Sequence, residues 1–541
     1  MTFSRFLRLW TAVVLAALFA GCAAAPTAPA KPKLVVLLVV DGLPQRQVLA
    51  LRDQLAPDGF ARFLDRGAWF ANAHCDHAFT VTAAGHAAIL TGAYPHRTGI
   101  IGNEWRDSTT GAHMYNTGDP QASYIGHKTD AGDGTSPKNL KVETLGDVLR
   151  RIEPRSKVIA ISGKDRGAIL PAGKLGTAYM YMDDTGLFAS SSYYMKQHPA
   201  WVDAFNSKRP ADRYFKTEWT ALLAEPAYAR SIPDSQPWFG PMGGKLPMMM
   251  GVAADDAPGP AFYRALLASP FVDALTLEFA RAAIAGEQLG RDDAPDILSV
   301  SLSGHDFVNH RWSAESRLSH DHLLQLDRQL EGLFRDLDAT VGKDNYIAVL
   351  TADHGFMPAT EFSRSQGLEV GRINFSQVVA RLNAGLTQRF GAGRWVLGNS
   401  ASSLLLDRQL IASRQLDLDS VAQEARRLLL AEPGFMAAYT RRELLTGSQA
   451  GQPFFNALRR SWHPDVSGDV QYTIKPNWMF GSAVATHGSP HPYDTHVPIL
   501  LYAPGWVKPG RIDARVEVVD IAPTLARLLR VPAPSASEGR P

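Results

Sequence analysis

The sequence lacks the features that mark several specialised classes of protein. Only two of its 541 residues are Cys, so a fold held together by a framework of disulfides is excluded. No segment repeats with a period of roughly 20–50 residues, which argues against a repeat architecture. No Gly-x-x-x-x-Gly-Lys-Ser/Thr motif is present, which argues against a kinase or NTPase of the P-loop class.

The chain also lacks an excess of charge of either sign. Its 55 Lys and Arg residues against 53 Asp and Glu residues give a net charge of +2. Arg5 and Arg8 belong to an N-terminal leader, and without them 53 basic residues face 53 acidic ones. A mature chain near neutrality gives no reason to expect nucleic-acid binding. Hydrophobic residues at 45% and charged residues at 20% are the proportions of a soluble globular protein.

The first 21 residues have the pattern of a signal peptide. Arg5 and Arg8 precede the apolar stretch Leu9–Phe19, and Ala20 and Gly21 follow it. The stretch is shorter than the roughly 20 residues that a membrane-spanning helix needs, whereas this order of basic, apolar and small residues is typical of an export signal. We therefore predict a signal peptide over residues 1–21 and a periplasmic location.

Cys22 follows the leader in a setting that resembles the bacterial lipobox, in which the Cys is acylated and becomes the mature N-terminus. Phe19 stands where Leu or Val is usual, and the alternative is an ordinary cleaved signal with an incidental Cys. Residues 22–32 are rich in Ala and Pro and are predicted to form a tether. Because Ala23 replaces the Asp that commonly retains lipoproteins in the inner membrane, we expect anchoring to the outer membrane, through this lipid alone.

Several apolar runs in the remaining chain have no polar alternation. Examples are Leu34–Val40, Val158–Ile161, Asp296–Leu302 and Tyr346–Thr351. Such runs are expected of strands that are buried on both faces of a parallel sheet. Helical patterns alternate with them, such as the Leu spacing in Ser316–Thr340. We therefore predict an α/β fold with a doubly wound, mostly parallel sheet and helices on both faces.

Residues 33–541 are predicted to form a single domain with two insertions. The insertions, at about 185–260 and 375–478, interrupt the rhythm of strands and helices. They either cap a substrate pocket or simply pack over the sheet, and the sequence leaves both interpretations open. The last residues, 533–541, are expected to form a frayed tail.

Acidic residues and His residues follow the apolar runs. They are Asp41, Asp306, His310, Asp353, His354 and, after the weakest run Ser482–Thr486, His487. Ligands of open α/β sheets lie beyond the carboxyl ends of the strands, so these side chains are expected to converge. Carboxylates and imidazoles without thiolates suit Zn²⁺, Mn²⁺ or Mg²⁺, and the His residues favour Zn²⁺. The pattern indicates a two-metal site for phosphoryl transfer.

Thr82 is a candidate nucleophile. It stands before the segment Ala83–Gly92, and a helix that begins there would place Thr82 at its positive end, where an anionic group is favoured. The alternative is that Thr82 merely caps the helix. Thr80 is the competing hydroxyl. Because Thr is a weak nucleophile, either residue would need a nearby metal.

Together these residues resemble the alkaline phosphatase superfamily, and most closely its phosphate-irrepressible alkaline phosphatase group, which is related to the type I phosphodiesterases and nucleotide pyrophosphatases. The resemblance covers most of Leu34–Leu529. It implies two zinc ions, with Thr82 forming a phospho-threonine intermediate. The implied ligands of one zinc are Asp41, Thr82, Asp353 and His354, and those of the other are Asp306, His310 and His487.

The same resemblance implies three further contacts with the phosphoryl group. Asn103 has the family spacing from Thr82, and Lys164 and Arg166 match a Lys-x-Arg pair of the monoesterase group. The diesterase relatives lack this pair. A monoester dianion carries more terminal charge than a diester, so two cations favour it electrostatically. The alternative for Lys164 and Arg166 is a solvated loop with ordinary charges.

Several His residues and one Cys compete with, or fall outside, the proposed site. His491 and His496 are alternatives to His487 as the last zinc ligand, although the family pattern favours His487. The remaining His residues without a matched role are taken as structural or exposed: His74, His77, His86, His96 and His305. Sulfatases of this superfamily use a Cys/Ser-x-Pro-x-Arg motif. Cys75 is followed by Asp-His-Ala-Phe, so the sulfatase motif is absent.

We therefore predict a zinc-dependent hydrolase of small-molecule phosphate monoesters with weak phosphodiesterase activity, present as a monomer. Two alternatives remain. The first is a phosphodiesterase or nucleotide pyrophosphatase. The second is a surface lipoprotein that keeps the fold as a binding module without turnover.

Overall fold

A computed structural model describes residues 30–240 and 243–541 of the chain. The predicted signal peptide, Cys22 and nearly all of the predicted tether therefore lie outside the described residues. Residues 32–541 form one compact unit. No helix among the described residues is both long enough and apolar enough to cross a membrane.

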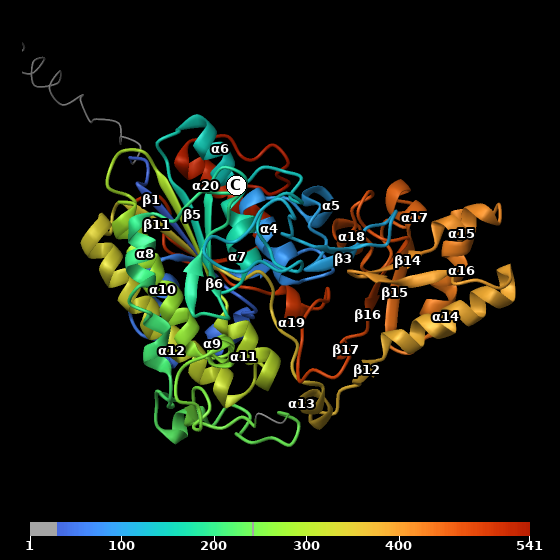
Figure 1. Ribbon diagram of the computed structural model, residues 1–541, viewed down its shortest axis with the longest axis horizontal. Helices are drawn as coiled ribbons and strands as arrows, with labels where there is room; N and C mark the ends of the chain where they lie inside the picture. Colours follow the sequence, from blue (N-terminus) through green and yellow to red (C-terminus); the bar gives the residue numbers. More distant parts are fainter. Residues whose placement is uncertain (1–29, 241–242) are drawn as a thin grey trace, which may run out of the picture. The chain divides into compact units, whose positions relative to one another are not determined.

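The centre of this unit is a nine-stranded sheet with the strand order β19-β2-β18-β11-β1-β10-β5-β6-β7 (Figure 1). The strands are β1 (Leu34–Val40), β2 (Ala68–His74), β5 (Val158–Ser162), β6 (Thr177–Met182), β7 (Leu187–Ala189), β10 (Asp296–Leu302), β11 (Tyr346–Thr351), β18 (Ile499–Tyr502) and β19 (Gly510–Glu517). The strands β11, β1, β10, β5 and β6 run parallel to one another, and β18 and β7 are antiparallel to their neighbours. The predicted mostly parallel sheet is confirmed.

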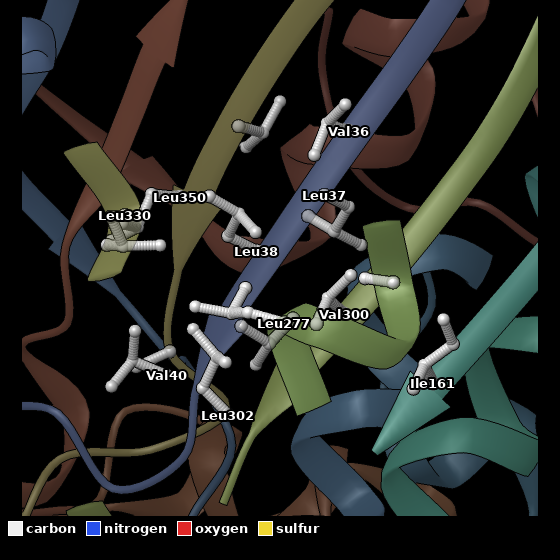
Figure 2. Packing of buried hydrophobic residues seen from close by; sticks show 14 of the residues in the cluster. Val36, Leu37, Leu38, Val40, Ile161, Leu277, Val300, Leu302, Leu330 and Leu350 are labelled. Atoms are coloured by element: carbon white, nitrogen blue, oxygen red, sulfur yellow. The ribbon is translucent and has the colours of Figure 1, made fainter. Parts of the chain in front are cut away.

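Strand β1 lies in the parallel middle of the sheet and is buried on both faces. All seven of its residues are buried, and it pairs in parallel with β10 on one side and β11 on the other. Leu277 and Leu330, which come from helices, lie beside Leu38, Val300 and Leu350 of these strands (Figure 2). The absence of polar alternation thus reflects burial on both faces.

Helices cover both faces of the sheet, with α8, α10 and α12 on one face and α4, α6, α7 and α20 on the other (Figure 1). Their bounds are α4 (Thr82–Thr91), α6 (Leu145–Ile152), α7 (Asp165–Ala172), α8 (Ala200–Asn206), α10 (Pro270–Gly286), α11 (Gly304–Trp312), α12 (Arg317–Leu337) and α20 (Ile521–Leu529). The predicted amphipathic helix is α12. It begins after Ser316, whose hydroxyl accepts the backbone N–H of Ser319, as is usual at an N-cap.

The two predicted insertions differ in structure. Residues 185–260 contain little regular structure, and side chains such as Val202, Trp219 and Phe239 join the core of the main sheet. Residues 375–478, called the second lobe below, have their own four-stranded sheet of order β13-β14-β16-β15 and their own core. The elements of the lobe are α14 (Phe375–Phe390), β13 (Val396–Ser400), β14 (Ser403–Leu406), α15 (Arg408–Ser413), α16 (Leu418–Ala431), β15 (Phe435–Thr440), α17 (Arg441–Thr446), α18 (Phe455–Arg460) and β16 (Val470–Ile474).

Smaller elements connect these parts. A hairpin of β3 (Glu104–Arg106) and β4 (His113–Tyr115) lies between α4 and the second lobe (Figure 1). Strands β12 (Gly371–Ile373) and β17 (Trp478–Phe480) pair at the base of the lobe, and β8 (Glu218–Trp219) pairs with β9 (Met248–Met249). The remaining helices are α2 (Gln45–Ala50), α3 (Phe60–Arg66), α5 (Pro95–Thr98), α9 (Pro260–Leu266), α13 (Thr360–Ser365) and α19 (Pro492–Thr495).

Two expectations about local structure are wrong. Residues 482–486 form no strand, so His487 stands on an irregular loop. The C-terminal tail is not frayed, because the N–H of Glu538 donates to the carbonyl of Gly92 at 2.7 Å and the Glu538 carboxylate lies 3.2 Å from His96. Both errors concern short segments of mostly small residues, which give no clear local pattern.

Candidate active site

The carboxyl ends of three adjacent strands bring together the acidic residues predicted from the sequence. Asp41 directly follows β1, and Asp353 comes two residues after β11. Asp306 lies in the first turn of α11, which begins just after β10. Because β11, β1 and β10 are neighbours in the sheet, residues more than 300 positions apart meet at one edge, as expected for an open α/β sheet.

Gly42 permits the close approach of these carboxylates. Its φ of +69° lies in the left-handed region, and its N–H donates to Asp353 Oδ1 at 3.1 Å. A Cβ atom at this position would lie 2.9 Å from Asp306 Oδ1 and 3.1 Å from the ring of Phe356. A side chain would thus be both strained and crowded, so the turn after β1 requires glycine.

Two groups of side chains at this edge have the geometry of metal sites. One consists of Asp306, His310 and His487, and the other of Asp41, Asp306 and His354. In each group one potential ligand atom per residue lies within 4.8 Å of the others. Asp306 belongs to both groups. Asp353 adjoins the second, with Oδ2 at 3.5 Å from His354 Nε2.

The three histidines of these groups share one hydrogen-bonding pattern. The Nδ1 atoms of His310, His354 and His487 lie 3.0, 2.8 and 2.8 Å from the carbonyl oxygens of Ala485, Gly355 and Thr80. A carbonyl can only accept, so each Nδ1 carries the hydrogen and each Nε2 keeps its lone pair. The Nε2 atoms face carboxylates of the cluster at 3.5–3.6 Å. Backbone carbonyls that fix the tautomer in this way are typical of metal-binding His residues.

The electrostatics of the cluster also fit a cation. Asp41 Oδ1 and Asp306 Oδ1 are buried and have no hydrogen-bond partner within residues 30–240 and 243–541. Burial is the main cause that raises the pKa of Asp41 well above its usual value, and repulsion from the Asp353 carboxylate adds to it. Burial and the neighbouring His354 lower the pKa of His487, so its imidazole is neutral. Buried carboxylates beside neutral imidazoles are stable only with compensating positive charge, which metal ions would supply.

Lys164 provides part of that charge. Its Nζ lies 2.8 Å from Asp41 Oδ2 and 2.6 Å from Asp306 Oδ2, and its side chain is 5% exposed. Burial opposes the ammonium charge, but Asp306 and Asp41 outweigh it and raise the pKa of Lys164. The alternative of a solvated loop does not hold for Lys164, whose side chain is buried.

Arg166 stands two residues further, in the first turn of α7. Its Nη1 donates to the hydroxyl of Tyr115 at 3.1 Å. Lys164, Arg166 and Tyr115 line one cavity of about 400 Å³, together with Tyr124 and Phe307. The lining is mixed in charge, because the carboxylates of Asp130, Asp133, Asp165, Asp183 and Asp184 share it with Lys128, Lys164, Arg166 and Arg264.

Thr82 is the first residue of α4. Its Oγ1 lies 3.5 Å from His354 Nε2, beside the group formed by Asp41, Asp306 and His354. Asn103 accepts the backbone N–H of Ala83 with its Oδ1 at 2.9 Å, which leaves the amino group of the side chain as the donor. The hydroxyl of Thr80 instead donates to the carbonyl of Ser489 at 2.9 Å. Thr82 and Asn103 are thus adjacent to the cluster, and the hydroxyl of Thr80 is held by a backbone carbonyl.

The competing histidines lie elsewhere. His491 Nε2 bonds to the carbonyl of Ile474 at 2.9 Å, and His496 Nε2 bonds to the carbonyl of Ala71 at 3.0 Å. Only His487 of the three belongs to a potential metal group among the described residues. Its ring stacks on His354, with centroids 3.5 Å apart.

These observations describe a cluster of carboxylates and imidazoles at the edge of a mostly parallel sheet. Comparison with known proteins identifies the family of the chain. A model of the type I phosphodiesterase / nucleotide pyrophosphatase family matches residues 35–494. The chain belongs to this family.

Among similar members, the alkaline phosphatase PafA of Elizabethkingia meningoseptica is 34% identical, over 94% of this chain and 94% of the relative. The alkaline phosphatase PhoV of Synechococcus elongatus is 34% identical, over 95% of this chain and 93% of the relative. The crystal structure of wild-type PafA superposes with a TM-score of 0.87 at 33% identity, and the match covers 95% of this chain and 99% of PafA. The resemblance to the alkaline phosphatase superfamily is confirmed.

One residue beside the cluster was not predicted to have a role there: His86, which was expected to be structural or exposed. His86 is fully buried on α4, and its Nδ1 lies 2.9 Å from the carbonyl of Thr82 and 3.1 Å from Asp353 Oδ2. Its Nε2 lies 2.9 Å from Ser301 Oγ on β10. The signal was its spacing, because position i+4 from Thr82 shares a face of the helix with Thr82. His77 and His305 are buried as well, whereas His74 and His96 are partly exposed.

Proposed function

We propose that this protein is an alkaline phosphatase, a hydrolase of phosphate monoesters. The observation that carries the proposal is the meeting of Thr82, the carboxylate and imidazole cluster, and the cations Lys164 and Arg166 at one edge of the sheet. The activity is also that of the named relatives, several of which are alkaline phosphatases 28–34% identical over most of this chain.

Two Zn²⁺ ions are the proposed cofactors. Asp41, Thr82, Asp353 and His354 would hold one ion, and Asp306, His310 and His487 the other. When bound, the ions would supply Lewis-acid stabilisation of the negative charge that develops on the attacking and leaving oxygens. The oxygen and nitrogen donors, the His tautomers and the unpartnered carboxylate oxygens support this assignment.

The chain's own residues would carry out the transfer in two steps. Thr82 Oγ1 attacks phosphorus as the bond to the alcohol oxygen breaks, and the proton lost from the Thr82 hydroxyl ends on that leaving oxygen, so that the alcohol departs and phospho-threonine forms. Water then attacks this phosphorus, inorganic phosphate leaves, and the hydroxyl of Thr82 is restored with a proton from that water. The amino group of Asn103 donates to a phosphoryl oxygen during both steps. The position of Thr82 at the N-terminus of α4 favours negative charge there.

Lys164 and Arg166 are proposed to favour monoesters over diesters. A monoester dianion has three terminal oxygens and more charge than a diester, so cations beside it contribute more binding energy. In the present structure Lys164 contacts Asp41 and Asp306. It would therefore act from within the carboxylate cluster, while Arg166 contacts the substrate from the cavity. Weak phosphodiesterase activity is expected as a side reaction.

A second candidate function is that of a phosphodiesterase or nucleotide pyrophosphatase, which the description of the matching family favours. The two functions are separated by kcat/KM for p-nitrophenyl phosphate and methyl p-nitrophenyl phosphate, which share one leaving group. A preference for the monoester is expected, and a preference for the diester would establish the second function. Turnover of neither ester by metal-loaded protein would instead favour a binding module without catalysis.

We further propose that the protein is a monomer in the periplasm, anchored to the outer membrane through Cys22. The basic leader, its apolar stretch and Ala23 after the Cys support this location. Cys22→Ala should move the protein from the membrane fraction to the soluble fraction. Wild-type protein that is already soluble after mild lysis would contradict the anchor.

A further inference from the structure

Arg166 is held from the side by a buried hydroxyl. Tyr115, at the end of β4, donates its hydroxyl hydrogen to Asp165 Oδ1 at 2.8 Å and accepts from Arg166 Nη1 at 3.1 Å. Burial and the nearby Asp165 raise the pKa of Tyr115, so the hydroxyl keeps its proton. It can therefore donate to the carboxylate and accept from the guanidinium at the same time.

Asp165 is itself fixed on both oxygens. Its Oδ2 accepts the hydroxyl of Thr117 at 3.2 Å, while its Oδ1 accepts from Tyr115. A Cβ atom on Gly134 would come within 1.8 Å of Asp165 Oδ2 and 2.1 Å of Thr117 Oγ1, so the chain closes tightly over this carboxylate. Networks of this kind restrict the orientation of the groups that they contain.

The hairpin that carries Tyr115 also holds Asn103. Tyr115 pairs with Glu104 across the two strands. Both the backbone N–H and the side-chain amide of Asn116 donate to the carbonyl of Asn103, at 3.2 and 2.7 Å. The two groups proposed to contact the phosphoryl oxygens, Asn103 and Arg166, are thus held by consecutive residues at the end of strand β4, Asn116 and Tyr115.

Arg166 has a donor that faces no protein acceptor. Its Nε is buried and has no hydrogen-bond partner in the part of the chain that the structure describes. Tyr115 occupies Nη1 only, so the hydroxyl fixes the plane of the guanidinium and leaves other donors for a ligand. A buried donor without a partner is costly unless a ligand completes it.

We propose that Tyr115 is a positioning residue that holds the Arg166 guanidinium against the phosphoryl group, and that the β3–β4 hairpin couples this contact to that of Asn103. The proposal rests on the proposed monoesterase function and adds a residue that acts through Arg166. Tyr115 therefore favours monoesters over diesters without contact with the reacting atoms.

The test is Tyr115→Phe, which removes the hydroxyl and keeps the ring. The kcat/KM for p-nitrophenyl phosphate should fall by about tenfold to a hundredfold, the range for a lost hydrogen bond to a charged group and a misplaced side chain. The kcat/KM for methyl p-nitrophenyl phosphate should fall much less, and inhibition by inorganic phosphate should weaken in parallel with the monoester loss. Tyr193→Phe is the matched control, because it makes the same change at a tyrosine whose hydroxyl donates to the carbonyl of Lys174 and not to this network.

A double-mutant cycle then separates positioning from a general structural role. In an Arg166→Ala background the further change Tyr115→Phe should have almost no effect on the monoester, because the group that it positions is absent. Equal losses for both esters, or additive effects of the two changes, would overturn the proposal. If Tyr115→Phe fails to fold, Asp165→Asn takes its place as the test, because this change weakens the acceptor of the Tyr115 hydroxyl. The ratio of monoester to diester kcat/KM and the double-mutant cycle with Arg166→Ala then decide. A wild type without monoesterase activity would instead refute the proposed function.

Discussion

The two sides of the active site are built differently. The sheet-edge side carries Asp41, Asp306 and Asp353 at the ends of three adjacent buried strands, whereas the hairpin side carries Asn103, Tyr115 and Arg166 on a hairpin and on a short helix. Parallel strands with fully buried residues fix the first side to the core of the molecule. The second side depends on a few hydrogen bonds between segments distant in sequence.

This difference suggests a division of labour. The sheet-edge side would perform the chemistry that monoesters and diesters share, because metals and nucleophile act on any phosphoryl group. The hairpin side would recognise the terminal oxygens that distinguish the two esters. Changes to the first side should therefore abolish both activities together, and changes to the second should alter their ratio.

The largest effect is expected from loss of a sheet-edge carboxylate. Asp306→Ala removes a potential ligand from both metal groups, so hydrolysis of both esters should fall by about a thousandfold or more, since metals supply much of the stabilisation of the transition state. Elemental analysis should show less bound zinc in protein whose thermal unfolding remains cooperative. Asp53→Ala is the control, because Asp53 is 65% exposed and pairs only with Arg230 within the described structure. Near-wild-type turnover of Asp306→Ala would contradict the ligand assignment.

A loss of similar kind is expected from Thr82→Ala, which removes the proposed nucleophile. Hydrolysis of both esters should fall by about a thousandfold. A nucleophile and the groups that activate it work together, so loss of one member removes most of their combined effect. Metal content and folding should be retained, because the change is small.

The matched control is Thr80→Val, since the hydroxyl of Thr80 donates to a backbone carbonyl. This variant should keep most of its turnover. Trapping the intermediate at low pH and mapping it by mass spectrometry should place phosphate on Thr82. Phosphate on Thr80 would show that Thr80, and not Thr82, is the nucleophile.

The smallest effect on catalysis is expected in the second lobe, which has a separate core. Leu429 on α16 is fully buried in that core, so Leu429→Ala should lower the free energy of unfolding of the lobe by about 2–5 kcal/mol. The kcat/KM at 25 °C should be unchanged for both esters. Leu430, the next residue of the helix, is 39% exposed, and Leu430→Ala should have little effect on either quantity. A large loss of activity in Leu429→Ala would show that the lobe supports the site.

The comparison also explains what could be predicted from the sequence. Strands β1, β10 and β11 were predicted because burial on both faces removes polar alternation, and α12 was predicted from its Leu spacing. Convergence of Asp41, Asp306 and Asp353 followed from the parallel sheet. The roles of these residues remain predictions, although their positions agree with them.

The remaining features could not be predicted, because they depend on tertiary contacts. The segment before His487 was wrongly expected to be a strand, since five small residues give no clear period. The tail carrying Glu538 is held by His96 and Gly92, more than 400 positions away. The contacts of His86 and Tyr115 likewise join segments that no local pattern connects. Side chains that act through such tertiary contacts were therefore not predicted on either side of the site.

The division of labour is tested most directly by the ratio of monoester to diester kcat/KM in Arg166→Ala, because Arg166 belongs to the hairpin side, whereas Lys164 contacts the sheet-edge carboxylates Asp41 and Asp306. A charged hydrogen bond contributes about 1.5–3 kcal/mol, so its loss should lower monoester hydrolysis by about one to two orders of magnitude. Diester hydrolysis should fall far less, and the ratio should shift towards diesters. Equal losses for the two esters would contradict the account, because Arg166 would then act on the chemistry that both substrates share.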